Sequence, residues 1–242
     1  MKKICLWSGP RNVSTAIMYS FAQRQDTIVV DEPLYGHYLR ISGAEHPGRH
    51  EIMQKINCDG NEAMKTLMAQ KSLHHKILFM KQMSHHLQRI NKEFLSKTEN
   101  IFLIRNPKEV LPSLTKQLPN ASIRDTGLDL QWQLFQELSS AGKSPIVIDS
   151  KELLINPEDI LAQLCKQLSI PFLKGMLNWE PGPIKEDGMW AKYWYQEVHK
   201  SNGFMPYKPK PDLSVELLSL FKECRPYYDN LVEHALTATR NE

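Results

Sequence analysis

Short runs of apolar residues recur along the 242-residue chain, and each is followed by a stretch with helical spacing. None of the runs alternates apolar with polar residues. Continuous apolar runs of this length are typical of strands buried on both faces, as in a parallel sheet. The pattern therefore predicts five strands, over residues 4–7, 27–30, 77–80, 101–104 and 146–148.

The segments between the runs carry apolar residues three and four apart, which predicts amphipathic helices. Two of these helices have a clear start, because Asn106-Pro107 and Asn156-Pro157 each place an asparagine cap before a proline at the first helical position. Strands that alternate with helices form right-handed crossovers. The fold class is thus α/β, with a central parallel sheet of about five strands flanked by helices. The helical positions are Ile17 and Phe21, Leu130, Leu134 and Leu138, and Leu161, Leu164, Cys165 and Leu168.

Two stretches interrupt this alternation within what we predict to be one domain over residues 1–242. Residues 32–61 are rich in Tyr, His and Gly, and residues 179–211 hold many of the aromatic residues and prolines. Open α/β sheets bind ligands at the carboxyl ends of their strands, where long loops gather. We therefore expect both stretches to be loops that shape a pocket for a small molecule. The aromatic residues of the second stretch include Trp190, Tyr193, Trp194, Tyr195, Phe204 and Tyr207.

The charge is nearly balanced, with 30 basic and 27 acidic residues. This balance argues against nucleic acid or a membrane as the partner. The cysteines are scattered, which favours free thiols in a reducing compartment over disulfides or a zinc site. Adjacent histidines, as in the 74–75 and 85–86 pairs, make poor joint metal ligands, so we expect no bound metal. The N-terminus does not read as a signal peptide, which predicts a cytoplasmic protein.

The loop after the first strand, residues 8–15 (SGPRNVST), is a candidate phosphate site. A strand–loop–helix arrangement directs free backbone N–H groups and the positive end of the helix toward one point. Arg11 adds a cation, and Ser14 and Thr15 add hydroxyl groups. The loop is not a Walker A sequence, because no lysine precedes the hydroxyl pair. An alternative interpretation is that Ser14 is an ordinary helix cap and Arg11 a surface residue.

A second candidate phosphate site follows the fourth strand, where Arg105 lies at the strand end and Ser113 two turns into the next helix. A phosphate near the first turn of that helix could contact the guanidinium group from one side and the hydroxyl from the other. Two such sites on one sheet suit a ligand with two separated phosphates.

Together these segments resemble the family of sulfotransferases that use 3′-phosphoadenosine 5′-phosphosulfate (PAPS). The first loop is similar to the family's P-[KR]-S-G-T-T loop, residues 105–113 match R-x-P-x-x-x-x-x-S, and residues 146–168 are similar to its segment after the fifth strand. The resemblance covers roughly residues 3–172. It implies a P-loop-like fold, PAPS as donor and 3′-phosphoadenosine 5′-phosphate (PAP) as product. The implied donor-binding residues are Pro10, Arg11, Asn12, Val13, Ser14, Thr15, Arg105 and Ser113.

The chain departs from the family pattern in two places. Asn12-Val13 stands where the family has a Ser-Gly pair, and valine restricts the backbone where glycine frees it. The glycine-rich phosphate loop of the family's C-terminal part has only a loose counterpart, at residues 200–203.

The resemblance also implies catalytic roles. Because the family needs no metal, the cations come from the protein, first from Arg11 and second from Lys81. The acceptor needs a general base, for which Glu32 ranks first. His85, with His86 beside it, ranks second, and His37 third.

The implied reaction is transfer of a sulfuryl group from PAPS to a hydroxyl or amine of a small-molecule or carbohydrate acceptor. Two alternatives stay open. A nucleotide-dependent small-molecule kinase could use the same scaffold, although the lysine–hydroxyl pair and a carboxylate for magnesium are missing. The departure at Val13 leaves open a nucleotide-binding module without catalytic activity.

Overall fold

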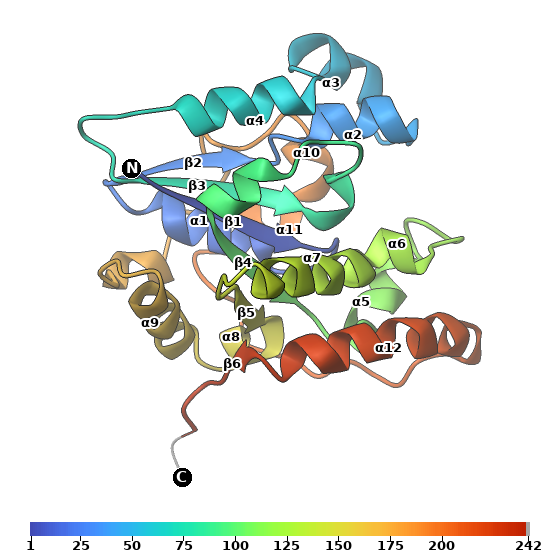
Figure 1. Cartoon of the computed structure of the whole chain (residues 1–242). Helices are drawn as coiled ribbons and strands as arrows, with labels where there is room; N and C mark the ends of the chain where they lie inside the picture. The colour runs from blue at the N-terminus through green and yellow to red at the C-terminus, as the bar shows by residue number, and fades with distance from the viewer. Residues whose placement is uncertain (241–242) are drawn as a thin grey trace.

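The computed structural model describes residues 1–240, which fold around one parallel sheet in the order β2-β3-β1-β4-β5-β6 (Figure 1). The five predicted strands are all present, and every neighbouring pair is parallel. The sixth strand has only two residues, too few to produce a recognisable apolar run. The strands are β1 (Lys2–Ser8), β2 (Thr27–Asp31), β3 (Ile77–Met83), β4 (Glu99–Ile104), β5 (Ile146–Asp149) and β6 (Ala235–Leu236).

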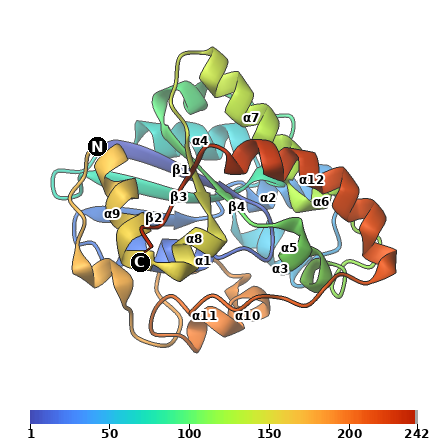
Figure 2. The same ribbon diagram turned by 90° about the horizontal axis from the view of Figure 1, so that it is seen from below.

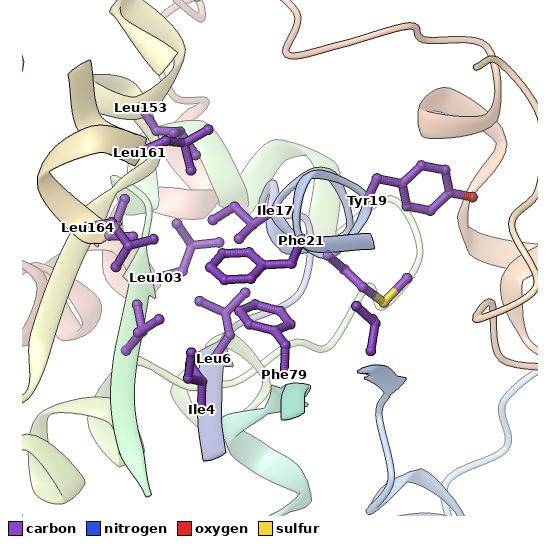
Figure 3. Close-up of a cluster of buried hydrophobic side chains, with 14 of the residues drawn as sticks. Ile4, Leu6, Ile17, Tyr19, Phe21, Phe79, Leu103, Leu153, Leu161 and Leu164 are labelled. Atoms are coloured by element: carbon purple, nitrogen blue, oxygen red, sulfur yellow. The ribbon is translucent and has the colours of Figure 1, made fainter. Parts of the chain in front are cut away.

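The sheet is buried on both faces, as the continuous apolar runs predicted. Along β1, Ile4 and Leu6 belong to one hydrophobic cluster, whereas Cys5 and Trp7 belong to the other. The first cluster includes Phe21 stacked on Phe79 with ring centroids 4.0 Å apart (Figure 3). Helices α1 (Ser14–Ala22), α8 (Ser150–Ile155) and α9 (Pro157–Gln167) cover that face, and α4 (Gly60–Ala69), α7 (Leu128–Ser140) and α12 (Leu218–Val232) cover the other.

Both predicted helix starts are confirmed. The Asn106 side chain accepts a hydrogen bond from the Lys108 N–H at the start of α5 (Pro107–Leu114), and the Asn156 side chain accepts one from the Asp159 N–H at the start of α9. In α7 the polar Gln131 is buried with the leucines, because its amide donates to the carbonyl groups of Trp7 and Leu103. It thereby ties α7 to the carboxyl ends of β1 and β4.

The prediction of an irregular loop over residues 32–61 is wrong, because that stretch forms α2 (Tyr35–Ser42) and α3 (Arg49–Lys55). Each helix covers only about two turns and has few apolar positions, so the helical spacing was easy to miss. The stretch 179–211 is largely irregular, with the four-residue helices α10 (Ala191–Trp194) and α11 (Gln196–His199). The remaining short helices are α6 (Ile123–Thr126), η1 (Ser84–His86), η2 (Glu93–Lys97), η3 (Lys174–Leu177) and η4 (Val215–Leu217).

The stretch 179–211 packs beside α1 at the lower edge of the view in Figure 2. The Tyr19 hydroxyl of α1 points out of the core cluster (Figure 3) and donates to the Asp187 carboxylate over 2.8 Å. The Tyr19 ring also meets Trp179 edge-on. The cysteines carry free thiols. Across residues 1–240, no helix is both long and apolar enough to cross a membrane.

Candidate active site at the carboxyl edge of the sheet

A cavity of about 860 Å³ opens where β1, β2 and β3 end. This is the edge at which open α/β sheets bind ligands. A second hollow of about 350 Å³ lies at the opposite edge, around the amino ends of β1 and β4, and is lined mainly by polar and charged residues. Of the residues predicted to form the site, the large cavity is lined by Pro10, Arg11, Asn12, Ser14, Thr15, Glu32, Lys81 and His85.

The loop between β1 and α1 is held tightly at both of its ends. Gly9 packs so closely against the Thr126 carbonyl oxygen that a Cβ atom there would collide with it. The Asn12 amide donates to the Leu103 carbonyl oxygen over 3.0 Å, and the Asn12 side-chain oxygen accepts from the Val13 N–H. Between these points Arg11 has a left-handed backbone with φ of 56°. Such a conformation is costly for a residue with a side chain, and it is concentrated at functional sites.

The Val13 departure does not impose the backbone restriction that the sequence suggested. Val13 has φ of −87°, which any residue adopts, and its side chain packs against the core rather than lining the cavity. Val13, not Ser14, is the residue that caps α1, and its side chain makes no capping bond. The alternative in which Ser14 is an ordinary cap is therefore wrong. Ser14 and Thr15 both line the cavity.

We expect Gly9→Ala to destabilise the protein by about 1–3 kcal/mol, the usual cost of forcing extra volume into a packed site. Urea unfolding would measure the loss. Gly175→Ala is the matched control, because a Cβ atom at Gly175 meets nothing within 4 Å. Equal stability of the two variants would show that the close approach of Gly9 to Thr126 does not fix the loop.

The second predicted phosphate element contacts the first directly. The Arg11 side chain donates from Nε to the Ser113 hydroxyl over 2.6 Å, and Arg105 donates from Nη1 to the Arg11 carbonyl oxygen over 3.2 Å. Arg105 also forms an ion pair with Glu109, from Nε to Oε2 at 3.0 Å. Arg105 and Ser113 do not line the cavity themselves. The structure thus brings the two elements together, with Arg11 joining them.

Residues 200–203 do not join this group. The Ser201 hydroxyl accepts from the indole N–H of Trp179 over 3.2 Å, and Gly203 pairs with Asn178 in an antiparallel bridge. None of the four residues lines the cavity. The departure noted at this segment thus extends to its position, because the segment lies outside the cavity.

At the other end of the cavity lies a buried ion cluster. The register of β2 and β3 places Asp31 beside Lys81, and Glu32 follows directly. Lys81 is inside β3, two residues before the strand ends, rather than after the strand as the sequence suggested. Its ammonium group donates to Asp31 Oδ1 over 3.0 Å and to Glu32 Oε1 over 2.5 Å. Glu32, like Arg11, has a left-handed backbone, with φ of 40°.

The two oxygens of Glu32 have different surroundings. Oε1 accepts from Lys81, whereas Oε2 lies 3.9 Å from Nδ1 of His86, beyond hydrogen-bond distance. Burial raises the pKa of the Glu32 carboxyl above its usual value and the Asp31 charge raises it further, while Lys81 opposes both. A carboxylate held at one oxygen with the other available is suited to accept a proton.

The histidines considered as candidate bases fall into two groups, according to whether they line the cavity. His85 and His86 line the cavity, and burial lowers the pKa of His85 to about 4 and that of His86 well below its usual value. Within residues 1–240, the Nδ1 atom of each has no hydrogen-bond partner. His37 faces away from the cavity: its Nδ1 accepts from the Gly60 N–H and its Nε2 bonds the Gln88 carbonyl oxygen. His37 is thus a structural residue.

Both stretches predicted to shape a pocket contribute to the wall beyond Glu32, although Tyr35, Tyr38 and His46 were not singled out from the sequence. This wall is aromatic: Tyr35 packs edge-on against Trp190, and Tyr38 stacks on His86 with ring centroids 4.5 Å apart. Of the aromatic residues noted in 179–211, Phe204 and Tyr207 do not line the cavity; Phe204 packs on Trp179, and Tyr207 donates to Glu109. The ring-bearing residues of the wall are Tyr35, Tyr38, His46, His85, His86, Trp190, Tyr193, Trp194 and Tyr195.

The sulfotransferase domain family matches residues 1–235, and the chain belongs to that family. Its fold is that of solved sulfotransferases. The sulfotransferase domain from the curacin biosynthetic pathway superposes with a TM-score of 0.53 at 14% identity, covering 96% of this chain and 97% of that one. A sulfotransferase from Alicyclobacillus acidocaldarius superposes with a TM-score of 0.54 at 13% identity, covering 98% and 97%. At these identities the likeness shows the shared P-loop-like fold.

Among curated proteins, the chain is 40% identical over 236 residues to branched-chain-amino-acid aminotransferase-like protein 2 of Arabidopsis thaliana. The match covers 97% of this chain and 42% of the plant protein. Protein 1 of the same name and organism is 40% identical over 230 residues, covering 94% and 41%. The chain thus spans about two-fifths of the length of these relatives, whose name describes the whole proteins.

Proposed function

We propose that the protein transfers a sulfuryl group from PAPS to a small-molecule acceptor. The observation that carries this proposal is that Arg11, Ser14 and Thr15 line the same cavity as Glu32. Cation, hydroxyl groups and a candidate base thus face one space. Its volume of about 860 Å³ lies within the range typical of ligand sites.

The two ends of the donor would be held by different elements. The first turn of α1 offers N–H groups that the helix itself cannot satisfy; Ser14 and Thr15 belong to that turn, and Arg11 lies just before it. These groups suit the 5′-phosphosulfate. Arg105 and Ser113 lie behind Arg11 and suit the 3′-phosphate, with Arg11 exchanging its bond to Ser113 for one to the donor.

Sulfuryl transfer is an in-line displacement like phosphoryl transfer. The acceptor oxygen or nitrogen forms a bond to sulfur while the bond from sulfur to the phosphate oxygen breaks and PAP leaves. The acceptor proton passes to Oε2 of Glu32. Arg11 stabilises the charge that develops on the bridging oxygen of the leaving phosphate.

The acceptor end of the cavity favours a molecule that carries no negative charge and has a flat or glycosidic face. Burial lowers the pKa of each of the histidines His46, His85 and His86, so their rings are neutral near pH 7. The aromatic wall supplies apolar surface. Glu32 would repel an acidic acceptor, since Lys81 is shared with Asp31. The acceptor group is then a hydroxyl or an amine.

Calorimetric titration with PAP, beside AMP, ADP and ATP without magnesium and then ATP with magnesium, tests the proposal. We expect PAP to bind at least tenfold more tightly than AMP, because a second phosphate adds charge-assisted hydrogen bonds. Equal binding of PAP and AMP, with ATP binding that depends on magnesium, would instead support the kinase. Tight PAP binding without consumption of PAPS across a broad acceptor panel would support the module without catalytic activity.

A further inference from the structure

The Lys81 ammonium group has no free N–H to offer a ligand. Lysine has three donors, and the structure gives each a partner: Asp31 Oδ1 at 3.0 Å, Glu32 Oε1 at 2.5 Å and the Tyr195 hydroxyl at 2.6 Å. Lys81 is 1% exposed. It could contact the donor only by giving up one of these bonds, so its role differs from that of Arg11.

Asp31 connects this lysine to a distant segment. Its carboxylate accepts from Lys81, from the Tyr195 hydroxyl at 2.8 Å and from the Gly188 N–H at 3.0 Å. Tyr195 has one phenolic proton, which goes to Asp31 rather than to Glu32, whose Oε1 is 3.3 Å away. The Tyr195 oxygen in turn accepts from Lys81 and from the indole N–H of Trp190.

We propose that Asp31, Lys81 and Tyr195 are positioning residues that hold Glu32 by Oε1 and leave Oε2 directed toward the acceptor. The proposal rests on the function proposed above. Under this proposal the segment 188–195, which carries much of the aromatic wall, also helps to orient the general base Glu32. Tyr195 is the link, since its ring lines the cavity and its hydroxyl lies in the ion cluster.

Two features of Glu32 support this assignment. Its left-handed backbone stores strain that the surrounding bonds must offset. Its carboxyl is also buried beside a second acid, a setting that favours the neutral form unless a cation opposes it. The groups that face Glu32 from the elements packed around it are Asp31 of β2, Lys81 of β3, His86 of η1, Tyr35 of α2 and Tyr195.

Carboxyl ¹³C NMR titration of the intact protein tests the proposal, with Glu32→Gln used to assign the signal. We expect the pKa of Glu32 to rise in Lys81→Met, because that change removes a bond that favours the carboxylate. It should rise less in Tyr195→Phe, because the Asp31 charge beside Glu32 then loses the phenolic hydrogen bond that partly neutralises it. Asp31→Asn should lower it, because the neighbouring negative charge is lost. Tyr227→Phe, a tyrosine on α12 away from the cavity, is the matched control.

Opposite shifts in Asp31→Asn and Tyr195→Phe support the positioning network; an unchanged Glu32 titration in both overturns it. If Lys81→Met fails to fold, the shifts in Asp31→Asn and Tyr195→Phe still test the proposal. The titration uses no donor, so it can succeed or fail independently of the PAP measurement. With an acceptor in hand, Tyr195→Phe should lower kcat about tenfold, the value of a hydrogen bond to a charged group, and leave PAP affinity unchanged.

Discussion

Replacement of Arg105 by alanine is expected to weaken PAP binding by about 10- to 100-fold, the equivalent of one charge-assisted hydrogen bond or a bidentate pair. The affinity for AMP, which lacks the 3′-phosphate, should change far less. The reason is the position of Arg105 behind the loop between β1 and α1, where its Nη1 donates to the Arg11 carbonyl oxygen and its Nε pairs with Glu109. Calorimetric titration of the variant with both nucleotides measures the difference.

The comparison with AMP separates two roles for Arg105. If Arg105 acts only by supporting the Arg11 backbone, the loop loosens and both nucleotides lose affinity equally. If PAP affinity is unchanged, the assignment of a 3′-phosphate site to Arg105 and Ser113 is wrong. Arg124→Ala is the matched control, because that arginine is 65% exposed in its side chain and pairs with Asp129 outside the cavity.

The sheet was predictable because its strands are buried on both faces and each main strand contains a run of three or four consecutive apolar residues. Each strand contributes to both hydrophobic clusters, so its central positions form a continuous apolar run, with polar residues such as Lys81 toward the strand ends. The helices between strands start at plain signals such as Asn106 and Asn156. The strand order and the two-residue β6 were beyond this reasoning. The order depends on which face of the sheet each connection crosses and how many strands it passes. The apolar runs look alike whichever strands are neighbours, so they do not predict the order.

The errors came from polar and aromatic residues whose partners are far away in the chain. Tyr195 contacts Lys81 across 114 residues, and Gln131 contacts Trp7 across 124. Nothing near Gln131 in the sequence indicates that an amide occupies the buried face of α7. For Tyr195 the one signal was its place in an aromatic-rich stretch, which could not tell it apart from Phe204 or Tyr207.

In the loop between β1 and α1, the sequence pointed to the wrong residue as the one with an unusual backbone. The sequence drew attention to Val13 because a glycine is usual there, yet Val13 has an ordinary backbone and Arg11 has the left-handed one. Of the non-glycine residues with positive φ among residues 1–240, Arg11 and Glu32 lie in the cavity, whereas Arg89 and Ser169 do not. The two strained positions in the cavity are the two residues ranked first for catalysis from the sequence.

Replacement of Glu32 by glutamine is expected to lower kcat by roughly 100-fold or more, the usual contribution of a general base, and to leave PAP affinity unchanged. Glutamine keeps the size of the side chain but cannot accept the acceptor proton. PAP release from PAPS, followed with an acceptor found by screening, measures turnover. Glu137→Gln, an exposed change on α7, is the control.

The pH dependence distinguishes Glu32 from His85. A general base works when deprotonated, so activity is lost as the pH falls through its pKa. Burial raises the pKa of Glu32, which places this loss above the usual range of a glutamate, whereas the pKa of His85 is lowered to about 4. If Glu32 is the base, Glu32→Gln removes the acid limb and His85→Asn keeps it. The reverse result would assign the proton to His85, and Glu32 would then serve only to hold Lys81 in the cluster.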